Sequence, residues 1–345
     1  MPATSTITVT VPATTANLGP GFDCIGAALS LYNSFQFSLL EPSATEKLKI
    51  TVTGSEAAKV KTDESNLAYV AFVTLYDRLN QSPPPVAIHI DMQVPLARGL
   101  GSSATAIVGG LVGANELAGA PLSQVEVMQL AIELEGHPDN VVPALLGGCC
   151  LAASNTPPQP PLSKGGLREQ LPLAKGEITS SPPRSKGGQG GGAWQICDIP
   201  WHPDIVSVVA IPDFELSTAE ARRVLPADYT RADAIFNASH LGLLVRALAA
   251  GDRDWLRCAL QDKIHQPYRR SLIRGYEAVQ EAAMNAGACG MVISGAGPTL
   301  LALTDVTNAD AVVREMAAAW GEFGVKADVR AISLDTEGAI ISNRN

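Results

Sequence analysis

The sequence predicts an α+β protein built from two domains. Its 345 residues suffice for about two domains of ordinary size. Strand-like and helix-like apolar periodicities follow one another in both halves of the chain, as expected of mixed α and β structure. Between the halves lies a segment rich in Pro, Gly and Lys. We therefore expect an N-terminal domain over residues 1–154 and a C-terminal domain over residues 194–345, separated by a disordered insertion over residues 155–193.

The expected elements follow from this periodicity. Before the insertion, strands are expected over 6–11, 29–40, 47–53, 86–93 and 148–153. Helices are expected there over 66–80, 102–118, 123–135 and 139–146, the first with a stripe of Leu67, Val70, Ala71, Thr74 and Leu75. After the insertion, strands are expected over 194–199, 205–211, 290–294, 299–304 and 325–332. Helices are expected there over 217–224, 231–250, 252–261, 271–286 and 308–321.

The insertion contains a repeated motif. PPLSKGG (160–166), LPLAKGE (171–177) and PPRSKGG (182–188) recur at equal spacing. Such a segment has almost no aromatic or β-branched residues, so it cannot bury enough apolar surface to offset the entropy of ordering. Lengthening a loop costs little free energy. We therefore expect a disordered loop between two strands.

Composition excludes several classes of protein. The net charge of −9 makes nucleic acid a poor partner. No window approaches the roughly 18 unbroken apolar residues of a membrane span, and the first ten residues lack the pattern of a signal peptide. The six cysteines form no CxxC pair, which favours buried thiols in a reducing compartment. We expect a cytoplasmic protein with small-molecule substrates, and the sequence leaves open whether it forms a homodimer.

The most informative segment is PLARGLGSSATA (95–106), which follows the alternating run VAIHIDMQV (86–94). A strand therefore leads into a glycine-rich turn, and a helix begins near Ser102. Unpaired amides and the positive end of the helix dipole favour a phosphate group there. Gly99 and Gly101 allow the backbone to approach an anion closely. The segment is neither a Walker A loop nor a GxGxxG motif, and an ordinary helix N-cap is the alternative.

Three further segments carry polar residues in unusual density. VPATTANLGPGFDCIG (11–26) contains Asn17 and Asp23, for which the alternative is a turn with Asx capping. ELEGHPDNVVPALLGG (133–148) contains carboxylates of the kind that bind Mg²⁺, or else a solvated helix end. MVISGAGPTLLAL (291–303) places a glycine-rich turn between two apolar strands, as either an anion-binding turn or a β-turn.

Together these four segments resemble the GHMP kinase superfamily over the whole chain outside residues 155–193. PxxxGLGSSA is similar to the family's phosphate loop, and SGAGPT to its C-terminal glycine loop. ANLGPGFDCIG combined with ELEGHPDNVVPALLGG is similar to the homoserine kinases. The resemblance implies an N-terminal domain like a ribosomal small-subunit protein, a ferredoxin-like C-terminal domain, and an active site between them.

The resemblance also implies the reaction. Members of this family transfer the γ-phosphate of ATP, with Mg²⁺, to the hydroxyl of L-homoserine, giving O-phospho-L-homoserine in threonine biosynthesis. A kinase of the same fold acting on another small alcohol, such as mevalonate or shikimate, is the alternative. A non-catalytic binding protein is disfavoured because it would have no need of Ser103 together with Glu135.

For the nucleotide, the resemblance implies that the backbone from Pro95 to Ser103 wraps the phosphates and that Asn66 lies near the adenine or ribose. The implied ATP-binding residues are Asn66, Pro95, Leu96, Ala97, Arg98, Gly99, Leu100, Gly101, Ser102, Ser103, Ala104, Gly295 and Gly297. The Arg98 side chain is expected to reach a phosphate oxygen. Ser103 and Glu135 are the implied Mg²⁺ ligands, with Glu133 as the alternative carboxylate.

For the amino acid, the implied binding residues are Asn17, Asp23, His137, Asp139, Thr218, Arg222 and Arg269. Arg222 and Arg269 are expected to bind the α-carboxylate, because a guanidinium group binds a carboxylate through two hydrogen bonds. Arg223 and Arg270 are the alternatives. Thr218 lies four residues before Arg222, hence on the same helix face.

The expected catalytic residues are Asn17, Asp23, Asn140 and Arg222. Asn140 stands where other members of the superfamily have an aspartate base. We therefore predict no dedicated general base. Positioning and charge neutralisation dominate phosphoryl transfer, so we expect Asn17 or Asp23 to hold the hydroxyl, which loses its proton late.

Overall fold

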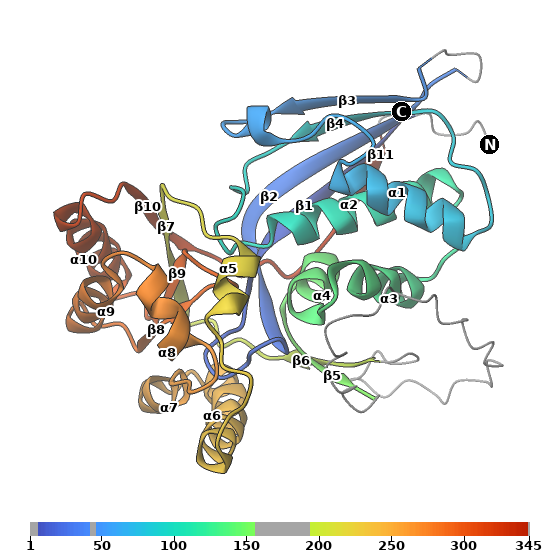
Figure 1. Ribbon diagram of the computed structural model, residues 1–345. Coiled ribbons are helices and arrows are strands. Elements are labelled where there is room, and N and C mark those ends of the chain that lie inside the picture. Colours follow the sequence, from blue (N-terminus) through green and yellow to red (C-terminus); the bar gives the residue numbers. More distant parts are fainter. Residues whose placement is uncertain (1–5, 42–45, 156–193, 344–345) are drawn as a thin grey trace.

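The computed structural model describes residues 6–41, 46–155 and 194–343 and confirms the α+β class. The expected disordered insertion lies outside the described residues, apart from Asn155. Two sheets form the framework, each covered by helices (Figure 1). Within the described ranges, no helix combines the length and apolarity needed to cross a membrane.

The first sheet has seven strands. They are β1 (Thr6–Ala16), β2 (Ile25–Leu39), β3 (Leu48–Thr53), β4 (Val86–Asp91), β5 (Cys149–Ser154), β6 (Trp194–Ile199) and β11 (Ile340–Asn343). The order is β11-β1-β2-β4-β3, with β5 joining β2 to β6, and only the β3–β4 pairing is parallel. Four helices cover one face: α1 (Leu67–Arg78), α2 (Ser102–Leu117), α3 (Gln124–Glu135) and α4 (Pro138–Leu146) (Figure 1).

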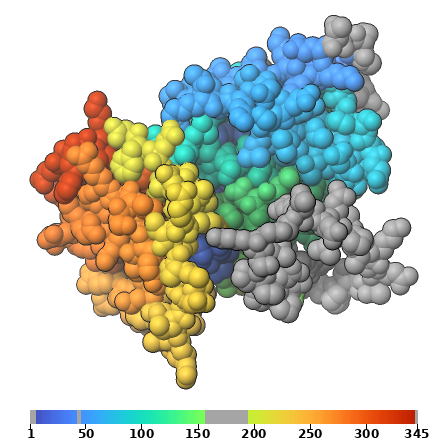
Figure 2. Space-filling model, viewed as in Figure 1, coloured from blue at the N-terminus to red at the C-terminus, as the bar shows by residue number. Residues whose placement is uncertain are grey.

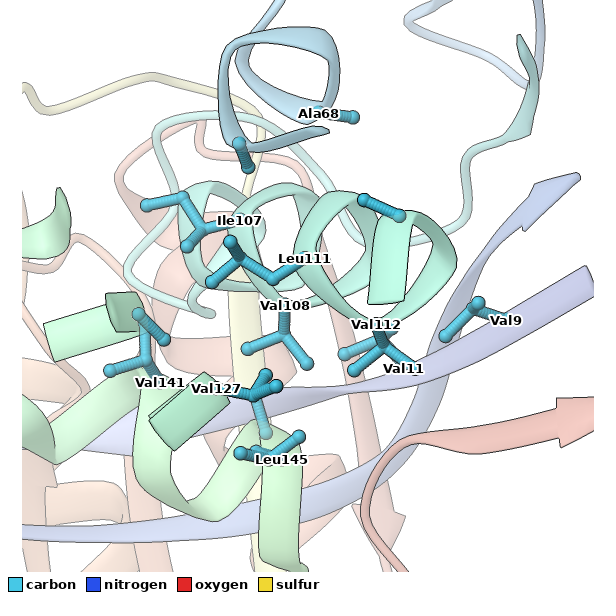
Figure 3. Close-up of a cluster of buried hydrophobic side chains, with 14 of the residues drawn as sticks. Val9, Val11, Ala68, Ile107, Val108, Leu111, Val112, Val127, Val141 and Leu145 are labelled. Atoms are coloured by element: carbon cyan, nitrogen blue, oxygen red, sulfur yellow. The ribbon is translucent and has the colours of Figure 1, made fainter. Parts of the chain in front are cut away.

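Helix α2 is rich in small residues because it packs closely on its neighbours. A Cβ at Gly109 would lie 2.4 Å from the Phe35 ring, and one at Gly110 would lie 2.2 Å from the Ala68 carbonyl oxygen. Its larger side chains fill the space between the sheet and the other helices, as Figure 3 shows for Ile107, Val108, Leu111 and Val112. This packing fixes the helix whose N-terminus faces the candidate site.

The second sheet is four-stranded and antiparallel. It contains β7 (Val206–Pro212), β8 (Gly290–Ile293), β9 (Leu300–Thr304) and β10 (Ala327–Ile332), in the order β10-β7-β9-β8. Helices α9 (Tyr276–Asn285) and α10 (Ala309–Glu322) complete a βαββαβ arrangement of the ferredoxin-like type. The long connection from β7 to α9 adds α5 (Thr218–Arg223), α6 (Arg231–Ala250), α7 (Arg253–Ala259) and α8 (Gln266–Arg269).

A shared apolar core joins the two sheets. Leu29 of β2, Val209 of β7 and Leu301 of β9 belong to one buried cluster, together with Leu248 of α6. Their side chains are at most 1% exposed. In Figure 2 the residues around α5 and α6, in yellow, lie between the N-terminal half, in blue and green, and the orange C-terminal half. The two domains are therefore packed as one body.

Most expected elements are present, and the differences have physical reasons. The helix expected over 271–286 begins at Tyr276, because Gly275 adopts φ 76° and a 3₁₀ turn (Arg270–Leu272) precedes it. Strand β11 and helix α8 were not predicted. The expected domain boundary groups β6 and β11 with the C-terminal domain, whereas both strands pair within the seven-stranded sheet.

Candidate active site

The glycine loop before α2 is held in a conformation that requires its glycines. Ala97, Gly99 and Gly101 all adopt left-handed φ values, of 52°, 74° and 65°. A Cβ at Gly99 would lie 2.2 Å from the Ser294 carbonyl oxygen, and one at Gly101 would lie 1.9 Å from Thr14 Oγ1. The loop is thus pressed between β1 and the second glycine turn, SGAGPT (294–299).

The N-terminus of α2 faces a cavity of about 530 Å³. Its N-cap is Gly101, and no side chain within the described part of the chain caps the helix. The amides of the first turn and the positive end of the helix dipole therefore suit an anion in the cavity. Ser102 and Ser103 lie in the cavity wall.

The cavity brings together residues from both domains. Its wall contains these predicted residues: Asn17, Asp23, Asn66, Leu96, Ala97, Arg98, Gly99, Leu100, Gly101, Ser102, Ser103, Glu135, His137, Asn140, Thr218, Arg222, Arg269 and Gly295. Four predicted residues do not line it: Pro95, Ala104, Asp139 and Gly297. Asp139 is buried behind His137.

Part of the wall was not predicted. Lys59, Val60, Lys61 and Ser65 precede α1, and Phe35, Ile90 and Met92 form an apolar wall beside them. The four residues before α1 have the composition of an ordinary exposed loop, so nothing in the sequence distinguishes them. The apolar residues belong to strands β2 and β4 or follow them, where the alternating pattern indicates only core.

Ser103 and Glu135 meet at the N-terminus of α2. Ser103 Oγ donates to Glu135 Oε1 over 2.8 Å. Burial raises the pKa of Glu135, and the hydrogen bond from Ser103 opposes this shift. Glu133, the alternative carboxylate, is exposed and does not line the cavity.

Two predicted nucleotide-binding side chains are already engaged within the protein. Arg98 donates hydrogen bonds to the carbonyl oxygens of Pro212, Leu96 and Asp213, so its guanidinium braces the loop rather than reaching a phosphate. The Asn66 side chain caps α1 and donates to the Lys61 carbonyl oxygen. We expect the backbone of Arg98, not its side chain, to face a bound phosphate.

Asn17 and Asp23 come from the turn between β1 and β2. Both adopt left-handed φ values, 57° and 55°. Asn17 donates to the Gly295 carbonyl oxygen over 2.9 Å and accepts from the Asp23 amide over 2.8 Å. Asp23 forms a two-fold hydrogen-bonded ion pair with Arg222 of α5, with distances of 2.9 and 3.1 Å.

Arg269 lies beside this pair and is 1% exposed. Its Nη1 donates to the Gly295 carbonyl oxygen over 3.1 Å, and its Nε to that of Ala221 over 3.2 Å. Burial, and next the charge of Arg222, lower the pKa of Arg269 to about 10. A carboxylate between the two guanidiniums would relieve their repulsion. The alternatives, Arg223 and Arg270, are exposed and lie outside the cavity wall.

His137 and Asn140 complete the polar wall at the start of α4. His137 Nδ1 lies 2.5 Å from Asp139 Oδ1. Burial alone would lower the pKa of His137, but the hydrogen bond and charge of Asp139 outweigh it and raise the pKa. Asn140 accepts a hydrogen bond from Thr14 over 2.7 Å, so its amide group is held against β1.

His265 supports this region from behind. Its Nε2 donates to the Gly19 carbonyl oxygen over 2.9 Å, and its Nδ1 lies 3.5 Å from Arg269 Nη1. Its ring stacks on Phe22, whose face lies 5.0 Å from the Arg269 guanidinium carbon. Only a neutral ring with its proton on Nε2 fits both polar contacts. Burial is the main cause that lowers the pKa of His265.

We predict that this histidine makes folding sensitive to acid. Its pKa in the folded protein is lowered from the ordinary value of 6.5, so the unfolded chain binds the extra proton as the pH falls below that value. The stability that His265 contributes is therefore present above pH 6.5 and is lost as the pH falls, with a slope of at most about 1.4 kcal/mol per pH unit. Urea unfolding of the wild type and of His265→Gln should show their free energies converging between neutral and acidic pH. A constant difference would contradict this.

The architecture and the glycine loop define a class of phosphotransferase, the GHMP kinases. The GHMP kinases N terminal domain profile matches residues 66–148, and the GHMP kinases C terminal profile matches residues 244–322. A mevalonate kinase from L. major shares the fold, with a TM-score of 0.64 and 17% identity over 95% of each chain.

Relatives at higher identity define the family within this class. The chain is 60% identical to a homoserine kinase of Trichodesmium erythraeum over 99% of this chain and 100% of the relative, and 53% identical to one of a Synechococcus strain over 95% of each. The crystal structure of a homoserine kinase from Cytophaga hutchinsonii matches with a TM-score of 0.79 and 26% identity over 98% of each chain. This chain belongs to the homoserine kinase family, which confirms the predicted resemblance.

Proposed function

We propose that this protein transfers the γ-phosphoryl group of ATP to the side-chain hydroxyl of L-homoserine, forming O-phospho-L-homoserine for threonine biosynthesis. The observation that carries this proposal is one cavity that joins an uncapped helix N-terminus to a carboxylate and two guanidiniums. The first feature suits a triphosphate, and the second suits the ammonium and carboxylate of an amino acid.

For the nucleotide, the backbone from Leu96 to Ser103 would follow the phosphates, with the first turn of α2 donating amide hydrogen bonds. The apolar wall of Phe35, Ile90 and Met92 offers a surface for the base, next to the residues that precede α1. Lys61 stands beside it and adds positive charge, whereas Lys59 is paired with Glu56 and Glu215.

Ser103 and Glu135 fit a Mg²⁺ ion. They offer one hydroxyl and one carboxylate, both hard oxygen ligands, at the mouth of the phosphate loop. No group of three or more acidic, His or Cys side chains that could hold a metal occurs among the described residues. Two protein ligands suit Mg²⁺, which usually takes one or two carboxylates and keeps substrate phosphates and waters. When bound, it would neutralise charge on the transferring phosphoryl group.

For the amino acid, the Asp23–Arg222 ion pair supports recognition of a zwitterion. A bound substrate would replace the contact between Asp23 and Arg222. Its ammonium group would then face Asp23, and its carboxylate would face Arg222 and Arg269. Asn17, fixed by Gly295, would hold the hydroxyl toward the phosphates. Thr218, in the first turn of α5, and His137 form the remaining walls.

We infer that no side chain acts as a dedicated general base. Asn140 cannot accept a proton usefully. Asp23 pairs with Arg222 and would face the ammonium group of a bound substrate, so it would be engaged by a cation in both states. We predict that Asp23→Asn raises the KM for homoserine, because the ammonium loses its carboxylate, and lowers kcat by less than about 10⁴-fold, the upper end of general-base contributions. Steady-state kinetics with ATP saturating measure both. A larger loss of kcat at an unchanged KM would assign Asp23 as the base.

The decisive experiment is an ADP-release assay with homoserine, mevalonate and shikimate as alternative acceptors. We expect turnover with homoserine and only background with the other two, and phosphorus NMR should identify a phosphate monoester on the side-chain oxygen. Turnover with mevalonate but not homoserine would overturn the proposed substrate.

A further inference from the structure

A second cavity, of about 440 Å³, lies in the C-terminal domain, away from the glycine loop. It opens beside the end of α7, the segment before α8, and α9. Its polar wall includes Arg257, Lys263, Arg270, Gln261 and Gln280. None of these residues belongs to the active site described above.

The charge of this cavity is unusual for a protein whose net charge is −9. Three of its wall residues are cations, and among the described residues none has a carboxylate partner closer than 3.9 Å, the Arg270–Glu277 distance. Arg257 has no ion pair there, and the Lys263 ammonium nitrogen lies 5.6 Å from the centroid of the Phe236 ring. Uncompensated cations in a concave site attract an anion.

The wall contains one carboxylate, Asp262, against three cations, so positive charge remains in excess. The Asp262 side chain is fully buried. Both oxygens are occupied: Oδ1 accepts from Asn237 Nδ2 and the Ile264 amide, and Oδ2 accepts from the His265 and Gln266 amides, all within 2.9 Å. Asp262 therefore shapes the segment that leads into α8.

A tyrosine in the cavity wall can also donate a hydrogen bond. Tyr276 is 4% exposed and lines the wall, yet its hydroxyl makes no hydrogen bond to the described residues. Burial raises the pKa of Tyr276 to about 12, so the phenol keeps its proton and remains a donor. Beside it, Leu260, Met284 and Met291 supply an apolar floor.

We propose that this cavity binds a small organic oxyanion, a carboxylate or phosphate monoester with an apolar portion, and that its occupancy changes the affinity for the amino-acid substrate. The second part rests on the proposed function. The cations would hold the oxyanion, Tyr276 would donate to it, and the floor would take the apolar portion. The segment that forms this wall carries His265 and Arg269 on its opposite side, where they contact Gly19 and Gly295.

Binding is tested by calorimetry on the full chain with phenyl phosphate and benzoate as probes and benzyl alcohol as the uncharged control. A non-hydrolysable ATP analogue, Mg²⁺ and homoserine are kept saturating, so that the active site does not take up the probe. We expect saturable binding of one or both anions and none of the alcohol. The two anions distinguish a phosphate ligand from a carboxylate ligand.

Variants then locate the site. Arg257→Gln combined with Lys263→Gln should weaken binding by about tenfold or more, equal to about 1.4 kcal/mol, and Tyr276→Phe should weaken it severalfold. Arg314→Gln, an exposed arginine on α10, is the matched control and should bind as the wild type does. No saturable binding up to about 10 mM probe, a concentration that corresponds to very weak affinity, or equal affinity in all variants, would overturn the proposal.

Coupling is measured separately, as the KM for homoserine with and without the bound probe. We expect the probe to shift this KM in the wild type but not in the double variant, with the KM for ATP unchanged. Binding without any shift of KM would overturn the coupling. Because calorimetry needs no turnover, failure of the site and failure of the proposed reaction are distinguishable.

Discussion

Replacing Ser103 with alanine or Glu135 with glutamine is expected to lower kcat for homoserine phosphorylation by about 10³-fold or more, equal to about 4 kcal/mol of transition-state stabilisation. Each variant removes one of the two proposed Mg²⁺ ligands, whose side chains meet at the N-terminus of α2. Phosphoryl transfer depends on neutralising charge on the phosphate oxygens. The loss should therefore appear mainly in kcat, measured at saturating ATP and homoserine over a series of Mg²⁺ concentrations.

Glu133→Gln is the matched control for this prediction. It removes the same charge from the same helix, two residues away, but the Glu133 side chain is exposed to solvent. We expect this variant to keep its Mg²⁺ dependence and to lose little activity. An equal loss in Glu133→Gln and Glu135→Gln would assign the effect to helix α3 as a whole and would contradict the assignment of Glu135 as the ligand.

Arg269→Ala is expected to lower kcat/KM for homoserine by about 10²- to 10³-fold, mostly through KM, since each hydrogen bond between charged groups contributes about 1.5–3 kcal/mol. Arg269 is buried and fixed by two backbone carbonyls, so under the proposed function it would be preorganised for the substrate carboxylate. The KM for ATP should stay unchanged. Arg269→Lys should recover only part of the loss, because an ammonium group does not bind a carboxylate through two parallel hydrogen bonds.

Substrate analogues separate this role from a structural one. 3-Aminopropan-1-ol lacks the carboxylate of homoserine, so the wild type should use it poorly and Arg269→Ala should use it no worse. 4-Hydroxybutanoate lacks the ammonium and should instead be insensitive to loss of Asp23. Arg223→Ala, which removes an exposed arginine outside both cavities, serves as the control. If Arg269→Ala lost activity toward 3-aminopropan-1-ol as severely as toward homoserine, carboxylate binding would not explain the effect.

The parts of the site that the sequence predicted share one property: their chemistry is local. The turn before α2 needs glycine at φ values of 74° and 65°. Gly99 and Gly101 therefore identify this turn from the local sequence alone. The α+β class and most elements likewise follow from periodicity within short windows. The homoserine kinase family was predicted from whole motifs rather than from single residues.

The parts that could not be predicted depend on contacts between distant segments. The resemblance implies Glu135 as the metal ligand but leaves Glu133 open as the alternative. The packing of α3 against α2 turns Glu135 toward Ser103 and Glu133 toward solvent. The Arg98 side chain was expected at a phosphate, but the carbonyls of Pro212 and Asp213, more than a hundred residues away, bind it. Strand β11 has only four residues and is defined by its pairing with β1.

The buried cluster that joins the two sheets limits how this enzyme admits its substrates. Separating the two domains would expose Leu29, Val209 and Leu301 to water. The free-energy cost would be about 2 kcal/mol for each large side chain. A hinge motion that opens the two domains in each catalytic cycle is therefore disfavoured. Helix α5 is better suited to move when substrate enters, because it has six residues, buries only Ala221 and carries Arg222 at the active-site cavity. Entry and release of the amino acid would then depend on movement of that short helix, while the two sheets and their shared core stay in place.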